Sequence, residues 1–230
     1  MTIEELVYDV KEIKSALEDD VDLDDLWILK KANSYRSIMI PQLYAQTPEI
    51  NPSWLQLTEK LSFTRTNAAD DPTVAISSVT LGRTWVPSVV ALPDDLGLYR
   101  LSGSGNIIGF EPTDFDTLMM KAYIKEEVSR NYGWYSRIGN FVYVYPFVIE
   151  GKAQVIAEDP TSIKYFNGTE YRDYEISDPY PLDQGMAQMI ILQILTVDLK
   201  LNEQSITDIV NDSQMNLKLM KDAPYSQKKG

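Results

Sequence analysis

The spacing of the hydrophobic residues changes twice along this chain, and this change constrains the fold more than any other feature. Near both ends, apolar residues recur every three or four positions, which is the spacing of one face of an α-helix. Between the ends they alternate with polar residues, which is typical of half-buried β-strands. The pattern therefore predicts helices at both ends of the chain and a β-rich region between them.

Two helices are expected within the first 50 residues. Thr2 and Glu5 have the spacing of a capping box, and an apolar stripe follows them, so a helix is predicted over residues 2–17. A second helix is predicted over residues 24–45, after an acidic break. We expect its inward face to comprise Leu26, Leu29, Ala32, Tyr35, Met39 and Leu43. Pro41 is expected to kink this helix or to end its regular part early.

The middle of the chain is expected to form strands. Residues 57–66 alternate in character, and residues 74–81 form a second strand candidate. Residues 84–93 are apolar but are interrupted by prolines, so they predict an edge strand or a loop. Residues 97–110 predict a hairpin with a glycine-rich tip at residues 102–106.

A short helix and a set of strands are predicted next. The helix covers residues 114–125, and residues 131–159 read as a meander with turns at Gly139-Asn140 and Glu150-Gly151. A last helix is predicted to begin near residue 181 and to be strongest over residues 183–201.

Together these patterns predict an α+β fold. We expect a small helical bundle, made from the N-terminal helices and a long C-terminal helix, with an inserted antiparallel β-rich lobe. The predicted parts are the bundle helices of residues 1–50, the β-rich lobe with one short helix (51–180), the C-terminal bundle helix (181–210) and a flexible tail or arm (211–230).

Two residue types that carry much of enzyme chemistry are missing. The chain has no cysteine and no histidine, which removes thiolate nucleophiles and the commonest general base and zinc ligand. The aspartates at positions 20, 22 and 24 resemble the start of a calcium loop, but Asp25 and Lys31 occupy the positions that need Gly and Glu. We therefore expect a protein that is not an enzyme and that uses no cofactor and no metal.

Charge is distributed unevenly along the chain. The net charge is −13, so a basic surface that grips nucleic acid is not expected. The first 25 residues hold ten Asp and Glu and two Lys, whereas the last 15 hold four Lys and one Asp. The oppositely charged ends could meet between neighbouring copies or could simply be two solvated ends.

Aromatic and sulfur-containing side chains suggest extensive contacts with other proteins. Ten per cent of the residues are aromatic, and Tyr and Met are typical of interface cores. Our candidate interface residues are Leu26, Tyr35, Trp134, Tyr143, Met186, Met189, Pro224 and Tyr225.

Several passages of the chain resemble one protein family. The passages YEISDPYPLDQGMAQMIILQILTVDLKL and IVNDSQ, together with RIGNFVYVYP, are similar to sequences in head-to-tail connector (adaptor or ring) proteins of short-tailed, crAss-like bacteriophages. RIGNFVYVYP resembles the central strand pair of these proteins, and YPLDQGMAQMIILQIL resembles their returning helix. The resemblance covers about two-thirds of the chain. It rests on the order of the predicted elements and on short similar passages of sequence rather than on an invariant motif.

This resemblance implies a function and a set of partners. The chain would be a virion structural protein at the head–tail junction, synthesised in the host cytoplasm and assembled into a homo-oligomeric ring, twelvefold in the family. It would join the portal protein to other connector or tail proteins, and genomic DNA would pass through the ring without specific binding. No membrane partner is implied.

Other functions stay open on the sequence alone. The chain could be another ring or tube subunit of the tail or virion. From other classes, it could be a carboxylate-based hydrolase, an oxygen-ligand metalloenzyme or a monomeric module that binds peptides by strand addition.

Overall fold

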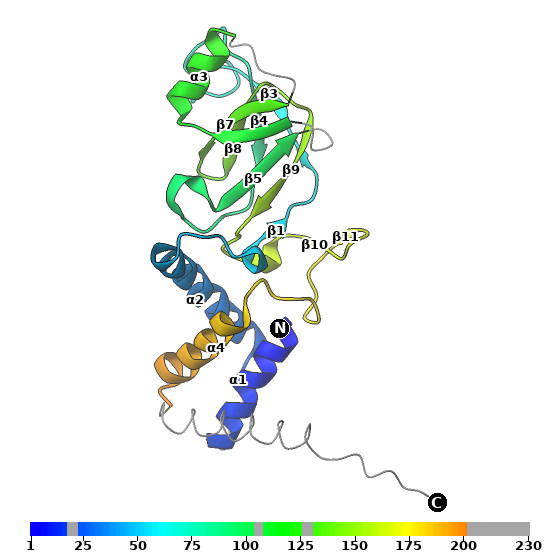
Figure 1. Cartoon of the computed structure of the whole chain (residues 1–230). Helices are drawn as coiled ribbons and strands as arrows, with labels where there is room; N and C mark the ends of the chain where they lie inside the picture. Colours follow the sequence, from blue (N-terminus) through cyan, green and yellow to red (C-terminus); the bar gives the residue numbers. More distant parts are fainter. Residues whose placement is uncertain (18–22, 104–107, 126–130, 202–230) are drawn as a thin grey trace, which may run out of the picture. The chain divides into compact units, whose positions relative to one another are not determined.

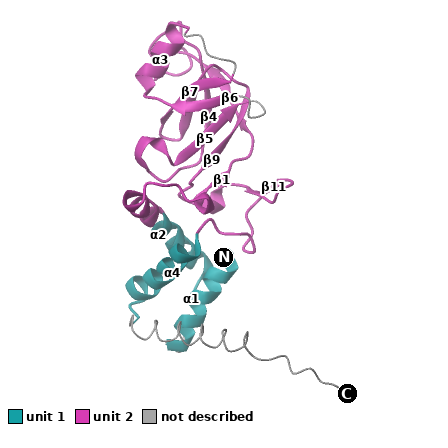
Figure 2. Cartoon of the chain, viewed as in Figure 1, with its two compact units in different colours: residues 1–36, 183–230 teal, residues 37–182 magenta. Residues whose placement is uncertain are grey.

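The computed structural model describes residues 1–17, 23–103, 108–125 and 131–201 (Figure 1). Part of the predicted hairpin tip, the first two aspartates of the calcium-like pattern and the predicted tail therefore lie outside the described residues. The chain forms two compact units (Figure 2). Unit 1 comprises residues 1–36 and 183–230, and unit 2 comprises residues 37–182.

Unit 1 is helical. Helix α1 (Ile3–Leu17) begins with the predicted capping box, in which the Thr2 amide donates to Glu5 Oε2 at 2.7 Å and the Glu5 amide donates to Thr2 Oγ1 at 3.1 Å. Helix α2 (Asp25–Gln46) begins in unit 1, and helix α4 (Gln184–Gln193) packs against α1. The Asp183 side chain caps α4 by accepting a hydrogen bond from the Met186 amide at 2.8 Å.

The predicted inward face of α2 is partly wrong. The buried residues are Ile28, Ala32, Arg36, Met39 and Ile40, whereas Leu26 is 64% exposed. The helix also continues through Pro41 to Gln46 without ending early.

Unit 2 is built on one large curled sheet. Its strands are β1 (Gln56–Leu57), β2 (Leu61–Ser62), β3 (Thr64–Thr66), β4 (Leu81–Trp85), β5 (Leu98–Gly103), β6 (Ile108–Pro112), β7 (Tyr132–Ile138), β8 (Phe141–Tyr145) and β9 (Glu150–Val155). The strand order is β1-β9-β5-β6-β7-β8-β4-β3, and β2 also pairs with β9. A separate two-stranded ribbon pairs β10 (Tyr165–Phe166) with β11 (Tyr171–Arg172).

The two ends of the sheet are connected by one short segment. β2 pairs with β9 and β3 pairs with β4, near opposite ends of the strand order. Only Phe63 separates β2 from β3. Residues 61–66 therefore join the two ends of the curled sheet, and little free strand edge remains among the described residues.

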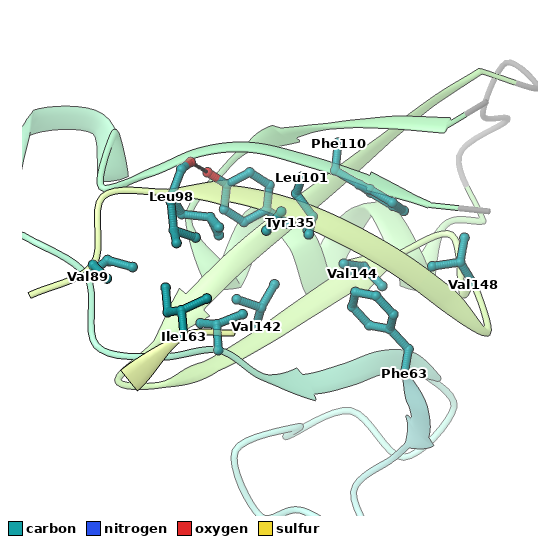
Figure 3. Close-up of a cluster of buried hydrophobic side chains, with 14 residues drawn as sticks. Phe63, Val89, Leu98, Leu101, Phe110, Tyr135, Val142, Val144, Val148 and Ile163 are labelled. Carbon is teal, nitrogen blue, oxygen red and sulfur yellow. Dashed lines mark hydrogen bonds between the residues drawn. The ribbon is translucent and has the colours of Figure 1, made fainter. Parts of the chain in front are cut away.

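A hydrophobic core fills the inside of the curl (Figure 3). Leu101, Phe110, Val142 and Val144 come from three different strands, β5, β6 and β8, and are each at most 6% exposed. The hydroxyl of Tyr135 donates to the Leu98 carbonyl at 3.1 Å, so this ring is buried without an unmet polar group. Burial of each such side chain contributes about 1.5–3 kcal/mol, which makes this cluster the main source of stability in unit 2.

The predicted fold class is wrong. The described chain is mostly β, with a nine-stranded mixed sheet and four helices, and is not a helical bundle with a long C-terminal helix. The sheet is mixed because β6 and β7 run parallel. A parallel pair needs a crossover connection, and helix α3 (Phe115–Tyr123) lies between these two strands in the sequence.

The C-terminal helix is shorter than predicted for a local reason. α4 ends at Gln193 and is followed by a π-helical turn, Ile194–Asp198, in which the Leu199 amide donates to the Ile194 carbonyl at 3.0 Å. Lys200 then takes a left-handed conformation (φ 57°), which stops the helix. No glycine or proline marks this stop in the sequence.

Four strand predictions also need correction. Residues 57–66 form three short strands, and residues 74–80 precede β4 as an irregular segment. The first two residues of the segment expected to be an edge or loop, Thr84 and Trp85, belong to β4, which pairs on both sides with β3 and β8. The strands β7, β8 and β9 are not a meander, because β9 pairs with β5 instead of β8.

Candidate interaction surface

The outer face of the sheet carries the most distinctive surface of unit 2. Directly opposed residues of antiparallel strands point to the same face, so the register fixes which side chains lie together. The register pairs Trp85 with Phe141 and Phe141 with Ile138, across β4, β8 and β7. The next row on this face holds Arg83, Tyr143 and Ser136.

Part of this face is covered by α3 and by residues 67–80. Val74, Val79, Leu118 and Ala122 pack there against the sheet and are at most 7% exposed. Lys121 of α3 is half-buried, and its Nζ lies 4.0 Å from the centre of the Trp134 ring. Such a cation–π contact helps to hold α3 on the strand below it.

A buried aspartate anchors the covering segment to the sheet. Asp71 Oδ2 accepts hydrogen bonds from Arg83 Nη1 and from the Tyr143 hydroxyl, both at 2.7 Å, and Oδ1 accepts one from the Thr73 amide at 2.9 Å. Hydrogen bonding from Thr73, followed by that from Tyr143 and Arg83, lowers the pKa of Asp71 well below its usual range. Burial, together with the bond to Asp71, raises the pKa of Tyr143. Asp71 therefore stays negatively charged and attaches the covering segment to strands β4 and β8 through Arg83 and Tyr143.

The covering layer leaves one row of large apolar side chains exposed. Trp85, Phe141 and Ile138 are 56%, 42% and 40% exposed, respectively. We call these three residues the aromatic shelf. The Arg83 guanidinium lies 5.0 Å from the centre of the Phe141 ring, which fixes one border of the shelf. Single exposed apolar side chains are common on protein surfaces. Three that lie opposite one another on adjacent strands form a patch that is typical of binding surfaces.

A cleft of about 440 Å³ adjoins the shelf and shares Ile138 with it. Its walls are formed by three residues of the 91–95 segment, Ala91, Leu92 and Asp95, by residues 112–115 and by residues 135–138 at the end of β7. Asp95 lies in this wall and pairs with Arg137, with Nε–Oδ1 and Nη2–Oδ1 distances of 2.7 and 2.5 Å. Asp95 and its neighbour Asp94 both have left-handed backbones, with φ of 57° and 53°. The ion pair with Arg137 thus fixes the strained turn at Asp94 and Asp95 to strand β7, beside the cleft.

The cleft is acidic at its rim. Asp114 accepts a hydrogen bond from the Thr117 amide at 2.8 Å at the start of α3, and bonding to Thr117 lowers the pKa of Asp114. Asp94 and Asp116 are exposed next to the lining residues. Arg137 is the basic side chain of the lining. This arrangement suits a ligand that combines apolar and cationic groups.

The catalytic alternatives need converging acids with raised pKa values. In the cleft, Asp95 is paired with a cation and the pKa of Asp114 is lowered. The pKa of Asp9 is raised by burial and by Glu12 and Glu5, but Asp9 lies on α1 in the other unit. Within the described residues, no group of three or more acidic side chains could hold a metal ion, and no helix is long and apolar enough to cross a membrane.

The predicted interface residues fall in several places. Leu26 and Met189 are exposed on α2 and α4, whereas Met186 is buried in unit 1. The Tyr35 hydroxyl donates to Asp198 Oδ2 at 2.8 Å, beside a 2.5 Å ion pair between Asp198 and Lys31.

In unit 2 the register brings two of the predicted residues to the same outer face of the sheet. Trp134 stacks on Tyr145 with ring centres 6.5 Å apart, and Tyr143 is buried against Asp71. Pro224 and Tyr225 lie outside the described residues.

The shelf itself was missed from the sequence. Phe141, Tyr143 and Tyr145 alternate along β8, and this period-two pattern is the signal that places Phe141 on the outer face. Trp85 was missed because the prolines that follow it suggested a loop. A scan against protein-family models found no match for this chain, and a search of curated proteins found none either.

Proposed function

We propose that this chain is a non-catalytic structural subunit of a phage virion, which assembles into a head-to-tail connector ring. In this role it joins the portal protein to tail proteins and surrounds the path of the exiting DNA. The aromatic shelf is the observation that carries the proposal, because three large apolar side chains are exposed side by side on adjacent hydrogen-bonded strands, where another subunit can cover them. The sequence resemblance supplies the connector class.

The energetics of the shelf suit a subunit contact. Full burial of a large apolar side chain contributes about 1.5–3 kcal/mol, and the shelf residues are about half exposed, so covering all three contributes about 3 kcal/mol. A stable interface buries about 800 Å² on each partner, which is more than three side chains supply. The shelf is therefore the centre of a larger contact, as expected for residues that carry much of a binding energy.

The charge of the chain is compatible with a DNA channel. A net charge of −13 repels the phosphate backbone, so a duplex would pass an acidic wall without being held. The strand-addition alternative is less well supported, because the strands at the ends of the sheet, β1 and β3, have only two and three residues.

Mass photometry and negative-stain microscopy of the full chain, alone and mixed with the portal protein of the same phage, test the proposal. We expect rings in at least one condition. The double variant Trp85→Ser, Phe141→Ser should lose them while still folding and unfolding cooperatively, because about half of each side chain is already exposed. Ile149→Ser, which removes an exposed apolar side chain (67% exposed) outside the shelf, is the control and should still form rings. A wild-type chain that stays monomeric in both conditions would overturn the proposal.

A further inference from the structure

We infer that the C-terminal segment of one copy, residues 216–230, binds the aromatic shelf and the adjoining cleft of a neighbouring copy. This inference rests on the proposed ring function and names the occupant of the surface described above. It is carried by three observations: the joined shelf and cleft, the acidic rim, and the composition and reach of the C-terminal segment.

The shelf and the cleft form one continuous receptor surface. Ile138 belongs to both, so an occupant can lie with one side chain on Trp85 and Phe141 while the adjacent part of its chain enters the cleft. The cleft volume of about 440 Å³ is in the range of sites that hold several side chains or a small ligand.

The occupant must match both the apolar shelf and the acidic rim. Residues 216–230 contain Leu217, Leu219, Met220 and Tyr225, and they carry four lysines against one aspartate. Tyr225 can form an aromatic contact on the shelf, and the lysines can approach the carboxylates that surround the cleft. Residues 26–46 also carry three cations and no acid beside aromatic and aliphatic side chains, but they form helix α2. Of the stretches outside the described residues, only residues 216–230 have this combination.

The segment is also long enough to reach another copy. Residues 202–215 join the last described residue, Leu201, to this segment, and a fully extended chain of 14 residues spans up to about 50 Å. This reach exceeds the size of a small domain, whose radius of gyration is about 15 Å.

Ring geometry explains why the contact is expected between copies. A closed ring of more than two subunits needs a head-to-tail contact, in which two different surfaces meet. A shelf that met only another shelf would give a dimer. The C-terminal segment supplies the second, different surface that this geometry requires.

Photo-crosslinking in the full chain tests the inference. Tyr225 is replaced by p-benzoylphenylalanine, and this chain is mixed with a ¹⁵N-labelled wild-type chain, with and without the portal protein, before irradiation and peptide mass spectrometry. We expect crosslinks between light and heavy chains at the shelf and at residues 91–95 or 112–115. Their yield should fall at least tenfold with Ile138→Asp in the receiving chain, and it should fall as salt increases because the attraction is partly electrostatic.

The matched control is Ile149→Asp, which introduces the same charge at an exposed isoleucine outside the shelf and should leave the yield unchanged. Crosslinks confined to single chains, crosslinks to other surfaces or to the portal, or the absence of crosslinks would each overturn the inference. Mass photometry of the same samples separates the two proposals. Rings without these crosslinks overturn only this inference, whereas the absence of any oligomer overturns the proposed function as well.

Discussion

Replacing Asp71 by Asn should destabilise unit 2 in a way that depends on pH. The carboxylate accepts hydrogen bonds from Arg83, Tyr143 and Thr73 and is only 6% exposed. Hydrogen bonds to a charged group contribute about 1.5–3 kcal/mol each, and removing one partner of a buried ion pair costs about 3–5 kcal/mol. Arg83 is one-third exposed and recovers some hydration, and Asn keeps one acceptor. We therefore expect a loss of about 3 kcal/mol in the free energy of unfolding at pH 7.

The sign of the pH dependence follows from the lowered pKa of Asp71. A group whose pKa is lower in the folded state stabilises the fold above its unfolded pKa, and this stabilisation is lost as pH falls. The unfolded pKa of Asp is about 3.9. The difference between wild type and Asp71→Asn should therefore be constant from pH 7 to pH 5 and should shrink by about 1 kcal/mol at pH 3.

Urea unfolding followed by tryptophan fluorescence measures this difference at each pH. Asp70→Asn is the matched control, because it removes the same charge from the adjacent, exposed residue and should change stability by less than about 0.5 kcal/mol. The reasoning fails if Asp71→Asn costs less than about 1 kcal/mol at pH 7, or if its cost is the same at pH 3 as at pH 7.

Two further predictions concern the backbone and the first helix. Gly97→Ala should cost about 3 kcal/mol in thermal unfolding, because its Cβ would lie 2.1 Å from the Val90 carbonyl oxygen. Gly109→Ala, where a Cβ meets nothing within 4 Å, should change stability by less than about 0.5 kcal/mol; equal losses in both variants would contradict the clash. Thr2→Ala should destabilise α1 by about 1 kcal/mol, seen as faster amide exchange in its first turn, because it removes the capping box. Unchanged exchange there would show that the cap contributes nothing measurable.

Local signals in the sequence predicted the helices and strands better than they predicted how these elements pack together in the fold. The predicted capping box at Thr2 and the predicted helix start at residue 114, where the Asp114 side chain is the N-cap, both lie where a helix begins, because such caps act over only three residues. The hairpin of β5 and β6 was also predicted, and the structure confirms their antiparallel pairing. These signals depend on neighbours in the chain, so they can be read without knowing the fold.

The errors arise where distant partners decide the structure. The buried stripe of α2 passes through Arg36, and a charged residue in the stripe hides its true position from a hydrophobic pattern. Val74 and Val79 are buried without being in a strand, because α3 covers them. The parallel pairing of β6 with β7 depends on the path of the crossover, which neither strand encodes.

The candidate surface could be predicted only in part. The alternation along β8 identifies Phe141 as a side chain of the same face as Tyr143 and Tyr145, but Tyr143 is covered and Phe141 is not. That difference comes from the covering segment, which reaches Tyr143 through Asp71, 72 residues earlier in the chain. The exposure of the shelf is thus a tertiary property that the strand pattern does not contain.

The connection of the sheet through residues 61–66 has a consequence for the order in which this protein can form. β2 finds its partner in β9, which is synthesised almost 90 residues later, so a ribosome must release most of unit 2 before the sheet can close. Unit 1 can fold only later, because its first helix packs against α4, which is synthesised after all of unit 2. The packing of α1 against α4 is therefore completed after the sheet has closed. The C-terminal segment is synthesised after every residue of the shelf and the cleft, so the contact that we infer between copies can form only once the complete receptor sequence has been made.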